Sequence, residues 1–280
     1  MSILKPERIV GIDAVLKASR LCQAVFNKLV STNVVTKLDH SPVTIADYGA
    51  QAVVNSIINA AFPNDPIVGE EDAKELKENR AMSLQVLDLV NSVVSRPLTE
   101  QQALEYIDLG TYRGGEKGRF WTLDPIDGTK GFLRGDQYAI CLALIIDGRV
   151  ELAIQGCPNL PSRLNDENSD RGSLFIAVKG EGAYERSLSD SDERRIRVSD
   201  VSTAAETVFC ESFEAGHSSQ SETEKIASIL NISQKPVRMD SQCKYGVIAR
   251  GQAGIYLRIP TRPDYQEKIW VYTQANHWFN

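Results

Sequence analysis

The sequence predicts an α/β protein made of layered sheets and helices, and three observations support this class. Helix-rich and strand-rich stretches alternate through both halves of the 280 residues, which is typical of helices packed between sheets. The segment IADYGAQAVVNSIINAAF (45–62) carries few charges, as expected for a helix buried on most sides. Two apolar runs flank Asp147-Gly148, a dipeptide that strongly favours a two-residue hairpin turn.

In the N-terminal half, apolar residues recur at helical spacing over 6–32. A second helix follows, with Ser41 or Thr44 as its cap. Residues 73–108 predict two helices that are separated near Arg96-Pro97, because proline breaks a helix. A very short strand at Ile67-Val68 and a strand at 119–125 precede the hairpin.

The C-terminal half predicts a strand pair around 180–182 and polar loops at 161–172 and 186–195. Strands near 207–211, 237–239 and 254–259 alternate with helices at 221–230 and 241–250. A change in pattern between 155 and 170 predicts two domains, residues 1–158 and 159–280.

The bulk composition narrows the class of function. The net charge is −6 and the pI is about 5.3, which argues against a nucleic-acid surface but allows a local basic pocket. Five scattered cysteines, an odd number without a C-x-x-C pair, predict free thiols in a reducing compartment. The sequence shows no secretory signal and no run of about 18 apolar residues that would span a bilayer. We therefore expect a cytoplasmic protein without a membrane partner, and the sequence gives no indication of its oligomeric state.

The stretch LDPIDGTKGF (123–132) places two aspartates, Asp124 and Asp127, three residues apart at the end of an apolar strand. Pro125 stiffens the turn between them. Two carboxylates held together repel each other unless a cation lies between them, and Mg²⁺ prefers such oxygen ligands. The amides of Gly128 and Thr129 could bind an anion beside the metal. The alternative is an ordinary turn in which both aspartates face water.

Two further acidic positions favour the metal site. Glu70 and Glu71 follow the short strand at 67–68, and Asp47 interrupts an apolar helix. Each has a simpler interpretation, the glutamates as a helix start and Asp47 as the partner of a basic side chain. Together with the two aspartates, they supply the acidic cluster that a two-metal hydrolysis site needs.

Three motifs, SPVTIADYGAQ, IVGEED and FWTLDPIDGTKGFLRG, occur in this order and resemble those of the inositol monophosphatase-like superfamily. Later stretches, GHSS, DSQCKYG, YLRIP and YQEKIW, resemble the branch of 3′(2′),5′-bisphosphate nucleotidases. The resemblance covers roughly residues 10 to 270. It implies alternating αβαβα layers, with a metal-binding N-terminal domain and a C-terminal domain that contacts the nucleotide.

The resemblance also implies residue roles. Glu70, Asp124, Asp127 and the backbone carbonyl of Ile126 would bind Mg²⁺, while Asp47 and Thr129 would activate water. The substrate would be bound by Gly128, Thr129, His217, Ser241, Lys244 and Arg258. Simpler alternatives are a solvated His217, an exposed lysine at 244 and an Arg258 that faces water at a strand position.

The implied substrate is adenosine 3′,5′-bisphosphate, which would give AMP and phosphate. The implied further substrates are 3′-phosphoadenylyl sulfate and the 2′,5′ isomer, and the implied context is sulfate assimilation with sensitivity to Li⁺. Two alternatives stay open. The first is a phosphatase of inositol phosphates, and the second is a non-catalytic nucleotide-binding protein on the same fold.

The sequence departs from the family pattern near its end. The family follows a tryptophan with an aspartate that binds metal, whereas here Val271 follows Trp270 and the chain stops nine residues later. We expect a truncated protein with an incomplete C-terminal layer. The loss of a carboxylate weakens metal binding, so we also expect a weak or inactive enzyme.

Overall fold

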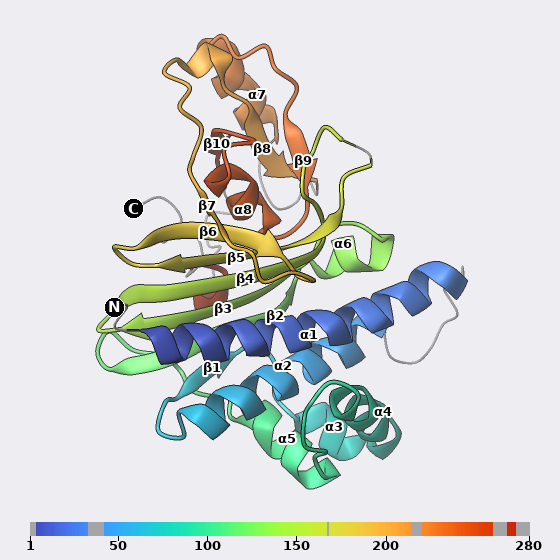
Figure 1. Cartoon of the computed structure of the whole chain (residues 1–280). Helices are drawn as coiled ribbons and strands as arrows, with labels where there is room; N and C mark the ends of the chain where they lie inside the picture. The colour runs from blue at the N-terminus through green and yellow to red at the C-terminus, as the bar shows by residue number, and fades with distance from the viewer. Residues whose placement is uncertain (1–3, 33–41, 167, 214–219, 260–267, 273–280) are drawn as a thin grey trace.

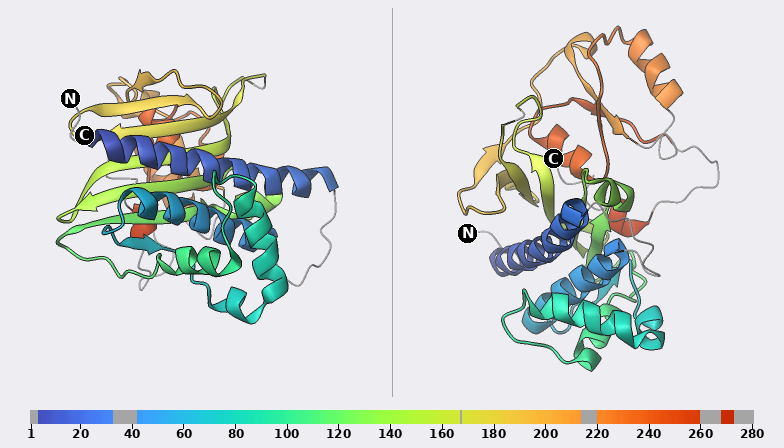
Figure 2. Two further views of the ribbon diagram at one scale, coloured as in Figure 1. Left: turned by 60° about the horizontal axis from the view of Figure 1, so that its bottom comes forward. Right: turned by 90° about the vertical axis from the view of Figure 1, so that its right-hand side faces the viewer.

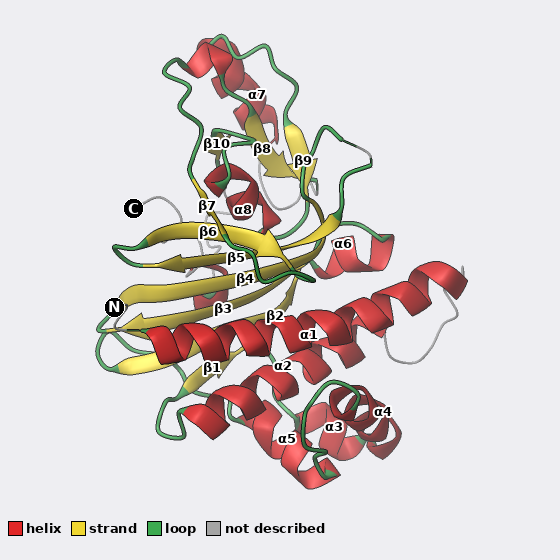
Figure 3. Cartoon of the chain, in the orientation of Figure 1, coloured by secondary structure: helices red, strands yellow, loops and turns green. Residues whose placement is uncertain are grey.

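The computed structural model describes residues 4–32, 42–166, 168–213, 220–259 and 268–272, and its helices and sheets form layers (Figures 1 and 3). The central sheet has seven strands in the order β1-β2-β3-β4-β5-β6-β7. A second sheet has three parallel strands in the order β10-β8-β9. The predicted α/β class is confirmed.

The central sheet is mixed, because β1 pairs parallel with β2 while all later pairs are antiparallel. Asp147 and Gly148 connect β3 to β4 with φ values of 48° and 73°. Both lie in the left-handed region, as a type I′ turn requires, and this confirms the predicted hairpin. The strands are β1 (Ile67–Gly69), β2 (Arg119–Asp127), β3 (Ala139–Ile146), β4 (Arg149–Pro161), β5 (Arg171–Val178), β6 (Gly182–Ser187) and β7 (Arg194–Ile196).

Helices α1 (Lys5–Thr32) and α2 (Pro42–Ala61) cover one face of this sheet (Figure 2). Leu142 and Leu144 of β3 belong to the core on this face, whereas Cys141 belongs to the core on the other, as the alternation of a strand requires. Helix α2 begins at Pro42, so Thr44 lies inside the helix and cannot be its cap. Ser41, the other predicted cap, lies outside the described residues.

Residues 73–108 form three helices, where the sequence predicted two. They are α3 (Lys74–Glu78), α4 (Arg80–Asn91) and α5 (Glu100–Asp108), and α4 and α5 pack against α2. Asn79 makes the extra break, because its backbone leaves the helical region (φ −126°, ψ 84°) and its side chain accepts a hydrogen bond from the Met82 amide. An asparagine in this role caps the next helix.

The other face of the central sheet carries α8 and the second sheet (Figure 2). Helix α8 approaches β5 closely at Gly246, where an added Cβ would lie 2.5 Å from the Phe175 ring. The elements of this part are α6 (Thr129–Arg134), a 3₁₀ turn (Ala204–Glu206), β8 (Phe209–Ser212), α7 (Gln220–Ile229), β9 (Val237–Met239), α8 (Cys243–Ala249), β10 (Ile255–Tyr256) and α9 (Ile269–Tyr272).

The chain organisation differs from the prediction at three places. Residue 158 lies inside β4, and the sheet continues to Ile196, so a boundary at 158 cuts through a strand; the division into two domains stays a prediction. The loop predicted to end at 195 already contains the start of β7, and the strand predicted over 254–259 is limited to two residues.

The five cysteines are buried and unpaired, as predicted. No helix in the described part of the chain is both long and apolar enough to cross a bilayer.

Candidate active site

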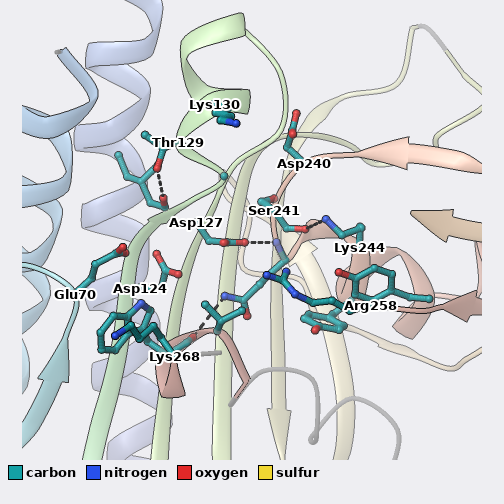
Figure 4. A pocket seen from close by; sticks show the side chains of 17 residues that line it. Glu70, Asp124, Asp127, Thr129, Lys130, Asp240, Ser241, Lys244, Arg258 and Lys268 are labelled. Atoms are coloured by element: carbon teal, nitrogen blue, oxygen red, sulfur yellow. Dashed lines mark hydrogen bonds between the residues drawn. The ribbon is translucent and has the colours of Figure 1, made fainter. Parts of the chain in front are cut away.

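Glu70 and Asp124 lie side by side because of the register of β1 and β2. These strands run parallel with Gly69 opposite Leu123, so the residue that follows each one emerges at the same edge of the sheet. Their carboxyl groups share a hydrogen bond. Two acidic residues 54 positions apart are thus brought together by strand pairing alone (Figure 4).

Pro125 and Ile126 form an irregularity in β2. Asp124 is opposite Cys141 and Asp127 is opposite Ala139, so two residues face one on the partner strand, as in a β-bulge. A proline is tolerated there because it needs no ladder hydrogen bond. The bulge re-aims the chain so that Asp127 lines the same pocket as Asp124. A carboxylate oxygen of Asp127 accepts a hydrogen bond from the Gln242 backbone amide (Figure 4).

The acidic cluster is held out of water. Asp124 is 2% exposed, and its Oδ1 is buried without a hydrogen-bond partner. Burial raises the pKa of Asp124 well above its usual range, and repulsion from Asp127, Glu70 and Asp47 raises it further. Burial likewise raises the pKa of Glu70, and repulsion from Asp127 raises it further. These aspartates are therefore not simply solvated turn residues.

Asp47 approaches the cluster from α2. It is 7% exposed. Burial is the main reason that its pKa is raised, and repulsion from Glu71 and Glu70 raises the pKa further. Among the described residues it has no ion-pair partner, and the charged groups that shift its pKa are carboxylates, so the structure gives no support to the interpretation of Asp47 as the partner of a basic side chain. Glu70 and Glu71 do not begin a helix either, because α3 starts at Lys74.

The donor set fits a hard divalent cation, which binds carboxylate and carbonyl oxygens. Asp124 offers an unpartnered oxygen, and the carbonyl of Ile126 accepts a long hydrogen bond of 3.5 Å from the Thr129 hydroxyl. Within the described residues, however, no three acidic, histidine or cysteine side chains already surround one metal position. Asp127 is turned to the Gln242 amide, so its carboxylate would have to turn back to complete the set.

The carboxylates form one side of a pocket of about 340 Å³. Its lining also includes four cationic side chains, Lys130, Lys244, Arg258 and Lys268, although the chain as a whole is acidic. In Figure 4, Glu70 and Asp124 lie on one side of Asp127, and Lys244 and Arg258 lie on the other. A cavity lined by both carboxylates and cations suits a ligand that bridges a metal ion and an anionic group.

Lys244 is a buried, hydrogen-bonded residue of the pocket wall and not an exposed helix residue. It is 4% exposed, and its ammonium donates to the carbonyls of Ser241 (2.6 Å) and Met239 (3.2 Å). A buried lysine of this kind is uncommon. The alternative of an exposed lysine at 244 is therefore wrong. Arg258 is half-buried and also lines the pocket, and its role stays a prediction.

Gly128 and Ser241 meet at the centre of the pocket wall. Gly128 has φ 89°, and a Cβ at this position would lie 2.7 Å from the Ser241 side chain. Ser241 itself has φ 63°, a conformation that non-glycine residues rarely adopt. A glycine at 128 thus allows the loop after β2 to contact the turn that precedes α8.

Two residues beside Ser241 were missed by the sequence prediction. Asp240 is 5% exposed and forms an ion pair with Arg134 of α6. Gln242 donates its amide to Asp127, and its side chain bonds to the Trp270 carbonyl (3.5 Å) while its Oε1 has no partner. Both belong to the motif DSQCKYG. The sequence feature that could have pointed to them is the run of polar residues just before the buried helix α8.

The structure gives fewer contacts for the remaining residues of the predicted site. Thr129 bonds to Ile126 in this structure, and in the described part of the chain it forms no hydrogen bond with Asp47. His217 lies outside the described residues. Val271 lines the pocket next to Trp270, so the position at which the family pattern has an aspartate does belong to the site.

The sequence matches known proteins over most of its length. A model of the inositol monophosphatase family matches residues 4–270. A relative from Schizosaccharomyces pombe named 3′(2′),5′-bisphosphate nucleotidase is 46% identical over 280 residues, which cover 94% of this chain and 79% of the relative. A relative from Arabidopsis thaliana named 3′(2′),5′-bisphosphate nucleotidase 1 is 43% identical and covers 92% of this chain and 80% of its own length.

Solved structures agree in fold. The CysQ protein from Bacteroides thetaiotaomicron, described as a bacterial member of the inositol monophosphatase family, superposes with a TM-score of 0.62 at 20% identity, over 99% of this chain and 86% of its own. An inositol monophosphatase from Anabaena gives a TM-score of 0.62 at 18% identity, over 99% and 81%. At these identities the superpositions support the shared fold alone.

Proposed function

The chain belongs to the inositol monophosphatase family, and within it we propose a Mg²⁺-dependent phosphatase that hydrolyses adenosine 3′,5′-bisphosphate to AMP and phosphate. The observation that supports this proposal most is the pocket itself, in which Glu70 and Asp124 lie on one side of Asp127 and Lys244 and Arg258 lie on the other. A bisphosphate has one phosphate to cleave and one to hold, and this pocket offers a separate chemical environment for each.

Glu70, Asp124, Asp127 and the Ile126 carbonyl would hold the metal. When bound, Mg²⁺ lowers the pKa of water and stabilises negative charge on the phosphoryl oxygens. The metal would also neutralise the repulsion that raises the pKa of Asp124. The carboxylates would then accept the cation as ionised ligands.

Asp47 and Thr129 would orient the attacking water. Asp47 is buried at the edge of the acidic cluster with an elevated pKa, a property that brings a carboxylate closer to the range useful for a general base. Thr129 follows Gly128 at the start of α6, where it can bond to the Ile126 carbonyl. A direct attack by water needs no covalent enzyme intermediate.

Ser241, Lys244, Arg258 and His217 would bind the phosphate that is not cleaved. Arg258 can form a fork of two hydrogen bonds with a phosphate, and Lys244 supplies a point charge. Gly128 and Thr129 would contact the phosphate that is cleaved through their amides. These assignments explain why cationic residues line a pocket in a protein of net charge −6.

We propose the same reaction on 3′-phosphoadenylyl sulfate and on the 2′,5′ isomer, since each presents a phosphate beside a second anionic group. This would give the protein a place in sulfate assimilation in the cytoplasm and make it sensitive to Li⁺. The two relatives named as bisphosphate nucleotidases support this substrate class. Its partners would be small nucleotides, with no nucleic acid or membrane.

A second function is favoured by Val271. An aliphatic side chain lines the pocket where the family pattern supplies a metal-binding carboxylate, and this favours a protein that binds the nucleotide but hydrolyses it slowly or not at all. Phosphate release is therefore measured with adenosine 3′,5′-bisphosphate and inositol 1-phosphate, with Mg²⁺ or with a chelator. Calorimetry follows nucleotide binding in parallel.

The nucleotidase proposal expects Mg²⁺-dependent release of one phosphate from the nucleotide and AMP as product. Faster turnover of inositol 1-phosphate supports an inositol phosphatase instead. Binding of the nucleotide without hydrolysis supports the non-catalytic function.

A further inference from the structure

We propose that Gln51 is the positioning residue that fixes the metal ligand Glu70, although it touches neither metal nor substrate. This inference rests on the proposed function, because it concerns the same site. Gln51 lies on α2, one turn beyond Asp47, so both side chains project from the same face of the helix. The helix would therefore contribute twice to the acidic cluster, directly through Asp47 and indirectly through Gln51.

The carboxamide of Gln51 bonds to both backbone groups of Glu71. Its Oε1 accepts from the Glu71 amide (3.0 Å), and its Nε2 donates to the Glu71 carbonyl (2.6 Å). The second Nε2 proton goes to the carbonyl of Ile107 at 2.9 Å. The side chain is 0% exposed, and both donors and the carbonyl are used.

This arrangement fixes the chain where β1 ends. Glu70 has Gly69 on one side, held in the sheet opposite Leu123, and Glu71 on the other, held by Gln51. The peptide groups on both sides of Glu70 are thereby constrained. The Glu70 side chain thereby leaves the backbone on the side of Asp124, beside which it lies (Figure 4).

Two glycines provide the space for this contact. A Cβ at Gly69 would lie 2.5 Å from the Gln51 Oε1, and a Cβ at Gly110 would lie 2.6 Å from its Nε2. The two glycines also bond to each other, from the Gly69 amide to the Gly110 carbonyl at 2.7 Å. Positions 69 and 110 therefore have no room for a side chain while the Gln51 carboxamide is in place. This close fit indicates that the carboxamide has a specific position in the site.

Asn55 provides a matched comparison, one helical turn further along α2. It is also 0% exposed, and its side-chain amide donates to the Tyr106 carbonyl at 2.8 Å. Gln51 and Asn55 therefore both attach α2 to the end of α5. Only Gln51 reaches the strand end that carries Glu70, so the two residues separate positioning from general stability.

The test compares Gln51→Met and Asn55→Leu, which remove the hydrogen bonds with little change in shape. The half-saturating Mg²⁺ concentration is measured by metal-induced thermal stabilisation, and kcat and KM for adenosine 3′,5′-bisphosphate are measured separately. Loss of a partner that orients a metal ligand costs about 10- to 100-fold in metal affinity or activity. We expect Gln51→Met to raise the half-saturating concentration by this factor and to lower kcat, while Asn55→Leu changes only the melting temperature of the metal-free protein.

Equal half-saturating Mg²⁺ concentrations for wild type and Gln51→Met would overturn the inference, as would equal shifts for the two variants. If Gln51→Met yields no folded protein, Gln51→Glu replaces it. It keeps the acceptor for the Glu71 amide and loses at least one of the two donors, and the same two outcomes decide. A wild-type protein that is not stabilised by Mg²⁺ and releases no phosphate would instead contradict the proposed function, so the two failures can be distinguished.

Discussion

Substitution of Asp124 by asparagine has opposite effects on stability and on activity if the acidic cluster is a metal site. Asp124 is 2% exposed, one of its oxygens has no partner, and three other carboxylates raise its pKa. Removing one of several mutually repelling buried carboxyl groups relieves about 1–3 kcal/mol, the free energy of roughly one to two pKa units. One kcal/mol corresponds to about 2–4 °C in a protein of this size. The metal-free variant should therefore melt about 2–12 °C above the wild type.

The same substitution removes a metal ligand. We expect a loss of phosphatase activity of at least about 100-fold and a much smaller stabilisation by Mg²⁺. Calorimetric melting in chelator at pH 7.5, repeated with Mg²⁺, measures both effects on one sample.

Asp240→Asn serves as the control, because Asp240 is equally buried but is paired with Arg134. Its substitution should lower the melting temperature with or without metal. An Asp124→Asn protein that is less stable than wild type in chelator, or that keeps wild-type activity, would show that Asp124 is not a strained metal ligand.

Three further predictions test other parts of the site. Val271→Asp restores a carboxylate at a pocket-lining position and should raise phosphate release and lower the half-saturating Mg²⁺ concentration by at least about 10-fold; unchanged kinetics would exclude a role for this position. Lys244→Gln removes a buried cation and should raise KM for the nucleotide by about 10- to 100-fold, since a hydrogen bond to a charged group contributes about 1.5–3 kcal/mol. An unchanged KM would mean that Lys244 does not bind the substrate. Burial, followed by repulsion from Glu70, raises the pKa of Glu71 from 4.5 to about 7, so the folded metal-free protein holds this proton more tightly than the unfolded chain and loses stability as pH rises from 4.5 to about 7. Melting temperatures across this window should fall in the wild type and fall less in Glu71→Gln, whereas a rise with pH would contradict the prediction.

The sequence predicted most of the elements because their signals are local. The helical spacing over 6–32 and the Asp147-Gly148 turn correspond to α1 and the β3–β4 hairpin. The break at Asn79 was missed because a single asparagine inside a helical pattern does not distinguish a cap from an exposed helix residue. The boundary at 158 followed a change in composition, and composition does not reveal that β4 continues across it.

The acidic part of the site was predictable because its residues lie in short motifs, whereas their contacts depend on the fold. Register brings Glu70 beside Asp124, and no local pattern encodes that register. The ion pair between Asp240 and Arg134 joins segments about 100 residues apart. The burial of Lys244 depends on how α8 packs in the fold, which the helical pattern does not reveal. Gln51 had no local signal, since a glutamine in an apolar helix indicates a buried contact but not its partner.

The most direct test is to locate the metal. Mn²⁺ takes the same hard oxygen ligands as Mg²⁺ and scatters X-rays anomalously, so a crystal of the protein soaked in Mn²⁺ reports the position itself. We expect an anomalous peak in contact with Glu70, Asp124 and Asp127, with the Asp127 carboxylate turned away from the Gln242 amide. A peak bound elsewhere, or none at a concentration that supports phosphate release, would contradict this expectation.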